Sequence, residues 1–220
     1  MAAVSGARAR SRGAPARSTY RHGDLRRALL EAGIELARTG GPEAVVLREA
    51  TRRAGVVPNA AYRHFAGRED LLEAVRAAAL AALAVAMEEE LARLRQEQQP
   101  ADHARASLRA VGAGYLRFAL AETGLFRTAF STSAAVDSDR DPAKAGSSGL
   151  NPFELLGAAL DRMVAAGVLP GERRAGAEYL AWSAVHGLAL LLIDGPLKGL
   201  PKKQAGALAQ RLLDMVEKGL

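Results

Sequence analysis

The sequence predicts an all-α protein with about nine helices, and three observations carry that prediction. Apolar side chains recur at spacings of three and four residues along most of the chain, which is the period of one helix face. No convincing run of alternating apolar and polar residues indicates a strand, and no hairpin turn joins two such runs. Glycine and proline interrupt the helical pattern at intervals that fit helix ends.

Length and composition limit the classes of protein. With 220 residues, of which 49% are hydrophobic, the chain can bury a sizeable core. The sequence has no cysteine, which excludes disulfide frameworks and thiolate metal sites and fits a reducing cytosol. The longest apolar run, residues 179–193, is 15 residues long. A bilayer span needs about 20 such residues, so we expect a buried helix and no membrane partner.

Positive charge is concentrated at the N-terminal end. Residues 1–68 hold 13 arginines and five acidic residues, a net charge of +8, whereas residues 69–220 hold 17 basic and 19 acidic residues. A basic module on a nearly neutral body indicates a polyanionic partner for one end of the molecule. We expect residues 1–19 to form a disordered basic arm, although their arginine-rich, acid-free composition also fits an organelle transit peptide.

Three short helices are expected within residues 20–66. The first covers about residues 22–39, where apolar residues spaced four, three and four apart form one face and Gly-Gly-Pro follows the end. The second covers about residues 46–53 and the third about residues 58–64, with a glycine turn between them. Two short helices joined in this way, with a polar outer face on the second, form a helix-turn-helix, whose second helix enters the DNA major groove.

Six further helices are expected within residues 67–220. Their approximate ranges are 68–95, 102–121, 124–131, 151–166, 172–194 and 202–218. Residues 132–149 are rich in Ser, Gly, Ala and Asp, and we expect them to form a mobile loop. Asn151, Pro152 and Glu154 form a capping-box pattern, which predicts where the next helix begins.

The outward residues of the helix-turn-helix have the chemistry that DNA binding needs. Arginine reaches phosphates or the edge of guanine, asparagine matches adenine, and Tyr and His can bond phosphate oxygens. The candidates from residue type and position are Arg48, Asn59, Tyr62, Arg63, His64 and Arg68. The alternative is a three-helix subdomain whose polar face is only solvated.

Several short motifs in residues 20–75 carry a family resemblance. They are Leu47-Arg48-Glu49, Ala54-Gly55-Val56, Tyr62-Arg63-His64-Phe65 and Glu69 with Leu71-Leu72 at the start of the fourth helix. Together they resemble the DNA-binding domain of the tetracycline-repressor (TetR) family of bacterial transcriptional regulators. The resemblance implies DNA contacts from Arg48, Asn59, Ala60, Tyr62, Arg63 and His64, with Arg68 in place of a phosphate-binding lysine.

Three positions depart from the family pattern. Val46 and Val57 stand where the family often has a Ser or Thr helix cap, and Gly67 stands where it often has Asp. A missing hydroxyl cap costs about 1 kcal/mol per helix. We therefore expect the second and third helices to be marginally stable until DNA binds.

A second resemblance lies in the segment YLAWSAVHGLALLLIDG. It is similar to a C-terminal bundle type with a Trp-His-Gly signature, here Trp182, His186 and Gly187. In the family such a bundle holds a ligand pocket, and ligand binding shifts the fourth helix and releases DNA. The candidate pocket residues are Tyr115, Phe118, Phe126, Phe130, Met163, Trp182 and His186. Plain core packing explains each of them equally well, and His186 could instead satisfy a buried carbonyl.

The last two helices, near residues 172–194 and 202–218, are expected to form a homodimer interface. The first is apolar nearly all round and the second has one apolar stripe. The alternative is that the last helix only covers its own bundle. The four histidines lie far apart, and no P-loop, dinucleotide fingerprint or nucleophile elbow is present. We therefore expect no metal, no cofactor and no catalytic site.

The resemblance implies a ligand-responsive, DNA-binding transcriptional regulator in the bacterial cytoplasm, associated with the nucleoid when bound to DNA. The expected form is a homodimeric repressor, released from a palindromic operator by a small-molecule effector. The alternative is a helical small-molecule-binding protein with a degenerate DNA-binding motif. The expected division is a basic arm (1–19), a DNA-binding domain (20–66) and a ligand-binding and dimerisation domain (67–220).

Overall fold

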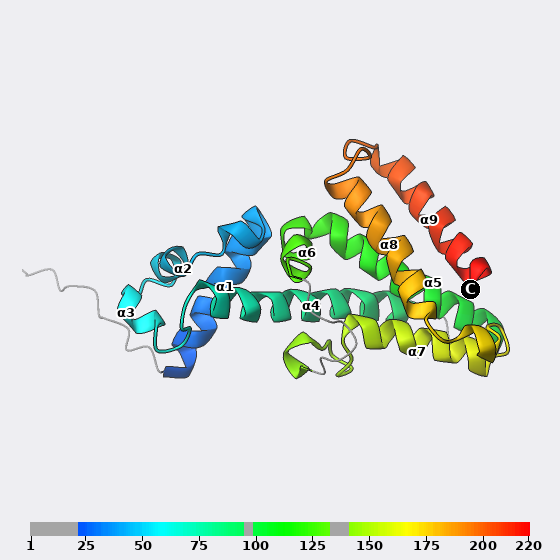
Figure 1. The fold of residues 1–220 in the computed structure, drawn as a ribbon, viewed down its shortest axis with the longest axis horizontal. Coiled ribbons are helices and arrows are strands. Elements are labelled where there is room, and N and C mark those ends of the chain that lie inside the picture. Colours follow the sequence, from blue (N-terminus) through cyan, green and yellow to red (C-terminus); the bar gives the residue numbers. More distant parts are fainter. Residues whose placement is uncertain (1–21, 95–98, 133–140) are drawn as a thin grey trace, which may run out of the picture.

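The structure, a computed structural model, describes residues 22–94, 99–132 and 141–220. Over these ranges it holds nine α-helices and three short 3-10 helices and no strand, which confirms the all-α prediction (Figure 1). None of the described helices is both long enough and apolar enough to cross a membrane. The expected basic arm, residues 1–19, and residues 133–140 of the expected mobile loop lie outside the described residues.

The first helices form a small three-helix unit at one end of the molecule (Figure 1). They are α1 (His22–Gly40), the 3-10 helix η1 (Pro42–Ala44), α2 (Leu47–Arg53) and α3 (Pro58–Ala61). Leu29, Val45, Phe65 and Leu71 are fully buried and form the core of this unit. Because Leu71 belongs to the following helix, that helix completes the core and fixes the unit to the rest of the chain.

The third helix is shorter than predicted. α3 ends at Ala61, whereas the sequence predicted about residue 64, and Tyr62, Arg63 and His64 form a turn. The backbone N–H groups of His64 and Phe65 both donate to the carbonyl of Ala61, at 2.8 and 2.9 Å. The bond from His64 spans three residues instead of the four of an α-helix, so the helix ends at Ala61. Tyr62, Arg63 and His64 therefore lie in a turn.

At the three helix starts that the sequence singled out, no side-chain cap is formed. Val46, Val57 and Gly67 are the N-cap residues of α2, α3 and α4, and none makes a side-chain cap hydrogen bond. Val46 and Val57 are 43% and 68% exposed, so their apolar side chains gain little burial in exchange. At the start of α4, Asp70 Oδ2 accepts from the backbone N–H of Ala66 at 2.9 Å, which ties the preceding chain to the helix but does not cap its first turn.

The remaining helices form a bundle around α4. They are α4 (Arg68–Ala92), α5 (Pro100–Ala121), α6 (Thr123–Ala129), η2 (Pro142–Lys144), α7 (Pro152–Ala165), η3 (Gly171–Arg173), α8 (Ala177–Ile193) and α9 (Lys202–Gly219). α4 runs from the three-helix unit through the bundle, α5 and α7 pack on it, and α8 and α9 pack on α5 (Figure 1). At Gly114 the backbone of α5 lies against α4, because a Cβ there would be only 2.6 Å from Met87 Cα.

The start of α7 agrees with the sequence prediction, whereas the start of α8 does not. α7 begins with the predicted capping box: Asn151 Oδ1 accepts from the N–H of Glu154 at 2.9 Å, and Glu154 Oε2 accepts from the N–H of Asn151 at 3.0 Å. α8 begins at Ala177, five residues later than the predicted 172. η3 precedes it, and Gly176 adopts a left-handed conformation with φ of 77°, which interrupts the helix.

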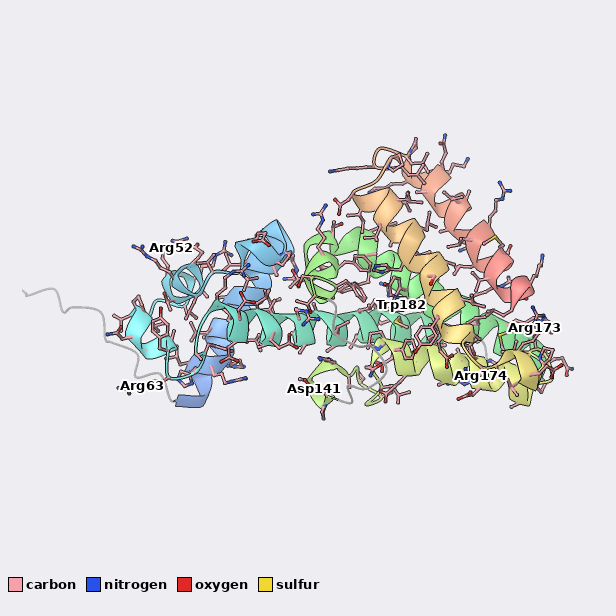
Figure 2. The ribbon with its side chains drawn as sticks, viewed as in Figure 1. Arg52, Arg63, Asp141, Arg173, Arg174 and Trp182 are labelled. Carbon is pink, nitrogen blue, oxygen red and sulfur yellow. The ribbon has the colours of Figure 1, made fainter. Side chains whose placement is uncertain are left out.

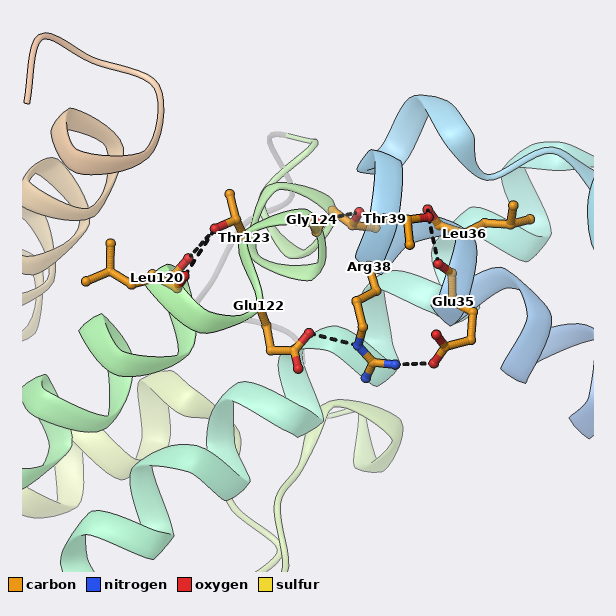
Figure 3. A network of polar contacts seen from close by, with 10 residues as sticks. Glu35, Leu36, Arg38, Thr39, Leu120, Glu122, Thr123 and Gly124 are labelled. Atoms are coloured by element: carbon orange, nitrogen blue, oxygen red, sulfur yellow. Dashed lines mark hydrogen bonds and ion pairs between the residues drawn. The ribbon is translucent and has the colours of Figure 1, made fainter. Parts of the chain in front are cut away.

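The three-helix unit meets the bundle where the end of α1 contacts α6 (Figure 3). Arg38 Nε donates to Glu122 Oε2 at 2.8 Å across this contact. Beside it, a Cβ on Gly124 would lie 2.2 and 2.3 Å from the carbonyl oxygens of Ala37 and Arg38. The two backbones are thus in direct contact, and a glycine at position 124 is what allows it. We call this contact, formed by Ala37, Arg38, Glu122 and Gly124, the α1–α6 joint.

Candidate nucleic-acid interface and ligand cavity

Exposed polar side chains of α2 and the α3 turn gather at the end of the molecule opposite α9. Arg48, Asn59, Tyr62 and Arg63 are exposed, and their side chains make no hydrogen bond or ion pair with the described residues. Figure 2 shows Arg63 at the tip of this end, far from Trp182 in the bundle. This surface therefore presents two cations, an amide and a phenol whose hydrogen-bonding atoms are available. Such groups are suited to bonding phosphate oxygens and base edges.

The other three predicted DNA-contacting residues lie differently. Ala60 and His64 are half-buried. Arg68 is engaged within the chain: an Nη donates to the carbonyl of Pro42 at 3.0 Å, and its guanidinium lies 2.8 Å from Glu69 and 3.5 Å from Glu43. It therefore links η1 to the start of α4, and the structure does not group it with the outward cations.

Two further arginines of α2 are neutralised locally. Arg52 donates two hydrogen bonds to Glu49, at 2.8 and 2.6 Å, and Arg53 lies 3.4 Å from the same carboxylate. The hydrogen bonds from Arg52 are the main reason that the pKa of Glu49 falls to about 2, so this carboxylate stays ionised. Arg48 and Arg63, by contrast, have no acidic partner among the described residues, so their positive charges are available to DNA.

The bundle contains a cavity of about 390 Å³ between α4, α5, α7, α8 and α9. This volume falls within the range of sites for small organic ligands, roughly 300–1,000 Å³. Of the predicted pocket residues, Tyr115, Phe130, Trp182 and His186 line it. The lining is mainly apolar and aromatic, and no group of three or more His, Cys, Asp or Glu side chains in the described residues could hold a metal ion.

The other three predicted pocket residues do not reach the cavity. Phe118, Phe126 and Met163 are 5%, 1% and 1% exposed and lie in the hydrophobic core. Phe126 still acts on the site indirectly, because its ring packs edge-on against Tyr115 with centroids 5.5 Å apart. Helical spacing placed these side chains inward, and only the packing separates core from cavity wall.

A hydrogen-bonded chain joins three residues of the wall. Trp182 Nε1–H donates to Tyr115 Oη at 3.1 Å, and Tyr115 Oη lies 2.6 Å from His186 Nδ1. The arrangement that satisfies all three has the tyrosine hydroxyl donating to Nδ1 of a neutral imidazole. Burial supports it, because burial raises the pKa of Tyr115 and lowers the pKa of His186.

The partner of His186 is therefore a side chain and not the buried carbonyl of the alternative interpretation. In this tautomer Nε2 carries the proton, and it has no hydrogen-bond partner among the described residues. Because His186 lines the cavity, this N–H is a donor available to a bound molecule.

Charged residues of the cavity wall were missed by the sequence interpretation, which assigned the pocket to aromatic residues. Arg76, Arg109 and Lys144 line the cavity, and none of the described residues in its lining is acidic. The one available signal was that Arg76 interrupts an apolar stretch of the long fourth helix, between Val75 and Ala77. Phe153, at the start of α7, also lines the cavity and was missed.

Large apolar side chains are exposed on the last two helices. They are Tyr179, Leu180, Leu190 and Leu191 on α8 and Met215 on α9, with exposed fractions between 42% and 67%. We call these residues the α8–α9 patch. Several large apolar side chains exposed on two neighbouring helices are typical of a protein–protein interface. It lies on the two helices that the sequence predicted for dimerisation.

Comparison with known proteins identifies the family. The model of bacterial regulatory proteins of the tetR family matches residues 29–75, and that of the tetracyclin repressor-like C-terminal domain matches residues 108–216. This chain belongs to the TetR family. The first match includes Arg48 and Arg63, and the second includes Trp182 and His186, so both resemblances seen in the sequence fall within matched segments.

Solved structures share the TetR fold over nearly the whole chain. A protein of unknown function from Rhodococcus sp. RHA1 is 26% identical with a TM-score of 0.72, covering 93% of this chain and 99% of that one. TetR from Acinetobacter baumannii AYE is 19% identical with a TM-score of 0.59, covering 91% and 96%. The TetR-family regulator PfmR from Thermus thermophilus is 22% identical with a TM-score of 0.56, covering 87% and 95%. No curated protein matches the sequence significantly.

Proposed function

We propose that this TetR-family protein is a homodimeric repressor that binds a palindromic operator and is released by a small molecule bound in the cavity. The observation that carries the proposal is that one helix, α4, joins the two candidate surfaces. It begins beneath the helix-turn-helix at Arg68, and further along Leu80 and Met87 line the cavity. A molecule that moves α4 therefore acts on the DNA-binding end.

In this proposal the residues of the DNA-binding surface make different contacts with DNA. Arg48 and Arg63 bond phosphates or guanine, Asn59 reads adenine and Tyr62 bonds a phosphate. Ala60 offers only a methyl contact to thymine, and His64 adds a polar contact from the same turn. Arg68 can contact a phosphate only by exchanging Glu43 and Glu69 for it.

The cavity supports a small-molecule effector. Its aromatic wall and the available Nε2–H of His186 combine an apolar surface with a specific hydrogen-bond donor. A variant of TetR from Acinetobacter baumannii AYE with a similar fold was solved in complex with minocycline, with a TM-score of 0.54. The α1–α6 joint offers a second route, because α6 contacts α1 directly and Phe130, which directly follows α6, lines the cavity.

The α8–α9 patch supports a two-fold dimer. Leu180 is 67% and Met215 60% exposed, and a second copy would remove both from water. A dimer of this kind presents two helix-turn-helix units related by a two-fold axis. It therefore predicts an operator of two inverted half-sites. As a DNA-bound regulator, the protein would act in the cytoplasm at the nucleoid, and the proposal assigns no catalytic step to the cavity.

Selection from random duplex DNA tests the proposal. We expect an enriched palindrome, whose affinity in fluorescence anisotropy falls steeply between two salt concentrations. Replacing Arg48 by Ala together with Tyr62 by Phe should weaken binding to that palindrome without changing the thermal midpoint. Arg162→Ala, on the exposed face of α7, is the matched control and should bind as tightly as the parent protein. Unchanged affinity in the double variant would contradict the assigned surface.

A second function is favoured by one specific observation. α2 and α3 have no side-chain caps, and α3 spans only four residues. This observation favours a helical small-molecule-binding protein whose DNA-binding motif is degenerate. Weak, salt-sensitive binding to every duplex, with no enriched sequence, is the result that this second function predicts.

A further inference from the structure

Arg76 is a buried cation on the cavity wall with an incomplete set of partners. Its side chain is 7% exposed, and one Nη contacts the carboxylate of Glu73. Its Nε makes no hydrogen bond, and it is the one buried side-chain nitrogen or oxygen in the described residues that lacks a partner. A buried donor without an acceptor is unfavourable, and more so when the group is charged. Stability alone therefore explains this arginine poorly.

A second cation shares the counter-charge of Arg76. Lys144 Nζ lies 3.7 Å from Glu73 Oε1, and the Lys144 side chain is 10% exposed. Glu73 is 54% exposed, so it faces both cations from the solvent side. Because one carboxylate offsets one positive charge, Arg76, Lys144 and Glu73 together leave at most one positive charge for a ligand among the described residues.

The third cation of the wall is neutralised elsewhere. Arg109 contacts Glu217, whose side chain is 4% exposed, and lies 3.3 Å from Asp214. Arg105 lies 3.4 Å from the same Glu217. Two arginines and two carboxylates form a closed set there, so Arg76 marks the end of the cavity that can accept an anion.

We propose that the effector is an organic acid with one negative charge, whose carboxylate bonds Arg76 and whose apolar body lies against Phe130, Phe153 and Trp182. A carboxylate accepts a strong, charge-assisted hydrogen bond from a guanidinium N–H, and Glu73 leaves the second Nη of Arg76 without an acceptor among the described residues. A phosphate dianion would need more positive charge than this end supplies. The inference rests on the proposed function of the cavity as the effector site.

The position of Arg76 connects the acid to the DNA-binding end. The preceding residue, Val75, is fully buried, and its side chain lies against the backbone of α1 at Gly33. One turn of α4 thus packs on the helix-turn-helix unit with one side and lines the cavity with another. A carboxylate bound to Arg76 acts within one residue of that contact.

Matched pairs of acids and amides test the inference on the full-length protein. The probes are octanoate, 4-phenylbutanoate and indole-3-propanoate, each beside its primary amide, which has the same shape without the charge. Trp182 is the only tryptophan in the chain and lines the cavity, so its fluorescence reports binding of the two non-indole pairs directly. Calorimetry serves the indole pair. We expect the best acid to bind about 10- to 100-fold more tightly than its amide, the range for a hydrogen bond to a charged group.

Two variants of α4 locate the effect. Arg76→Met removes the charge and keeps much of the length, and it should abolish the preference for the acid over its amide. Arg93→Met, at the exposed end of α4, is the control and should keep the preference. Without any probe, Arg76→Met should leave the thermal midpoint unchanged or raise it. A large fall would show that Arg76 serves the fold, and it would overturn the inference.

The outcomes separate this inference from the proposed function. Equal binding of acids and amides, or no acid binding at all, overturns the organic-acid effector. Operator binding is measured in a separate assay and does not depend on this result. An acid preference that persists in Arg76→Met also overturns it. Acids that bind through Arg76 and leave the operator complex intact support the site and contradict the proposed release of DNA.

Discussion

Replacing Gly124 by Ala tests the α1–α6 joint. The new Cβ would lie 2.2 and 2.3 Å from two backbone carbonyl oxygens, whereas real Cβ atoms essentially never approach within 3.0 Å. The end of α1 or the start of α6 must therefore move by about 0.8 Å, and neither can do so by turning a side chain. Overpacking of this kind costs about 1–3 kcal/mol, and we expect the upper end because the obstacles are backbone atoms.

A gain in helix propensity partly offsets this strain. Alanine is favoured over glycine by up to about 1 kcal/mol inside a helix, so the net loss of stability should be about 2 kcal/mol. Gly206→Ala, in α9, is the matched control, because nothing lies within 4 Å of its Cβ, and it should stabilise the protein slightly. The assay is urea unfolding followed by circular dichroism at a fixed protein concentration. A Gly124→Ala protein as stable as the parent would refute the close contact.

Three further predictions concern the N-cap of α4, the α8–α9 patch and the half-buried His186. Gly67→Asp should stabilise α4 by about 0.5–1 kcal/mol in urea unfolding, because it adds the missing N-cap at a position with open space; no gain would contradict the uncapped start. Leu180→Glu should convert a dimer to a monomer in size-exclusion chromatography with light scattering, without lowering helicity, and a persistent dimer would exclude this surface. Burial lowers the pKa of His186 in the folded protein below the ordinary 6.5. The contribution of the neutral imidazole to the stability of the folded protein is therefore fully present above pH 6.5, and it is lost as the pH falls through the folded-state pKa. His186→Gln should therefore reduce the loss of stability on acidification, and an unchanged pH profile would contradict a half-buried neutral imidazole.

Local sequence patterns predicted much of the fold, including most of the helices. The capping box of Asn151 and Glu154 is formed as predicted, because both hydrogen bonds join residues three apart. The start of α8 was wrong for the opposite reason. Residues 172–175 favour helix by composition, but Gly176 adopts a left-handed conformation and Arg174 pairs with Asp161 of α7 at 2.7 Å, so the chain turns before α8. Such pairing cannot be read from local spacing.

The candidate site shows the same limit. Helical spacing placed Tyr115, Phe126 and Phe130 on inward faces, and all three do face inward. Which inward residues meet a cavity depends on how five helices fit together, so Phe126 could not be separated from Phe130 in advance. The burial of Arg76 depends on its position against η2, where Lys144 shares Glu73 across 71 residues of sequence. No pattern within α4 predicts that partner.

The close contact at Gly114 gives α4 a pivot. From Met87, where the two backbones meet, back to Arg68 is 19 residues, a lever arm of about 28 Å at 1.5 Å per residue. A tilt of about 5° at the pivot would carry the first residue of α4 through about 2.5 Å, most of the 3.4 Å rise between neighbouring base pairs. Because Gly114 brings the crossing so close to the helix axis, a small rotation about this point would shift the far end of α4 by most of one step of the double helix.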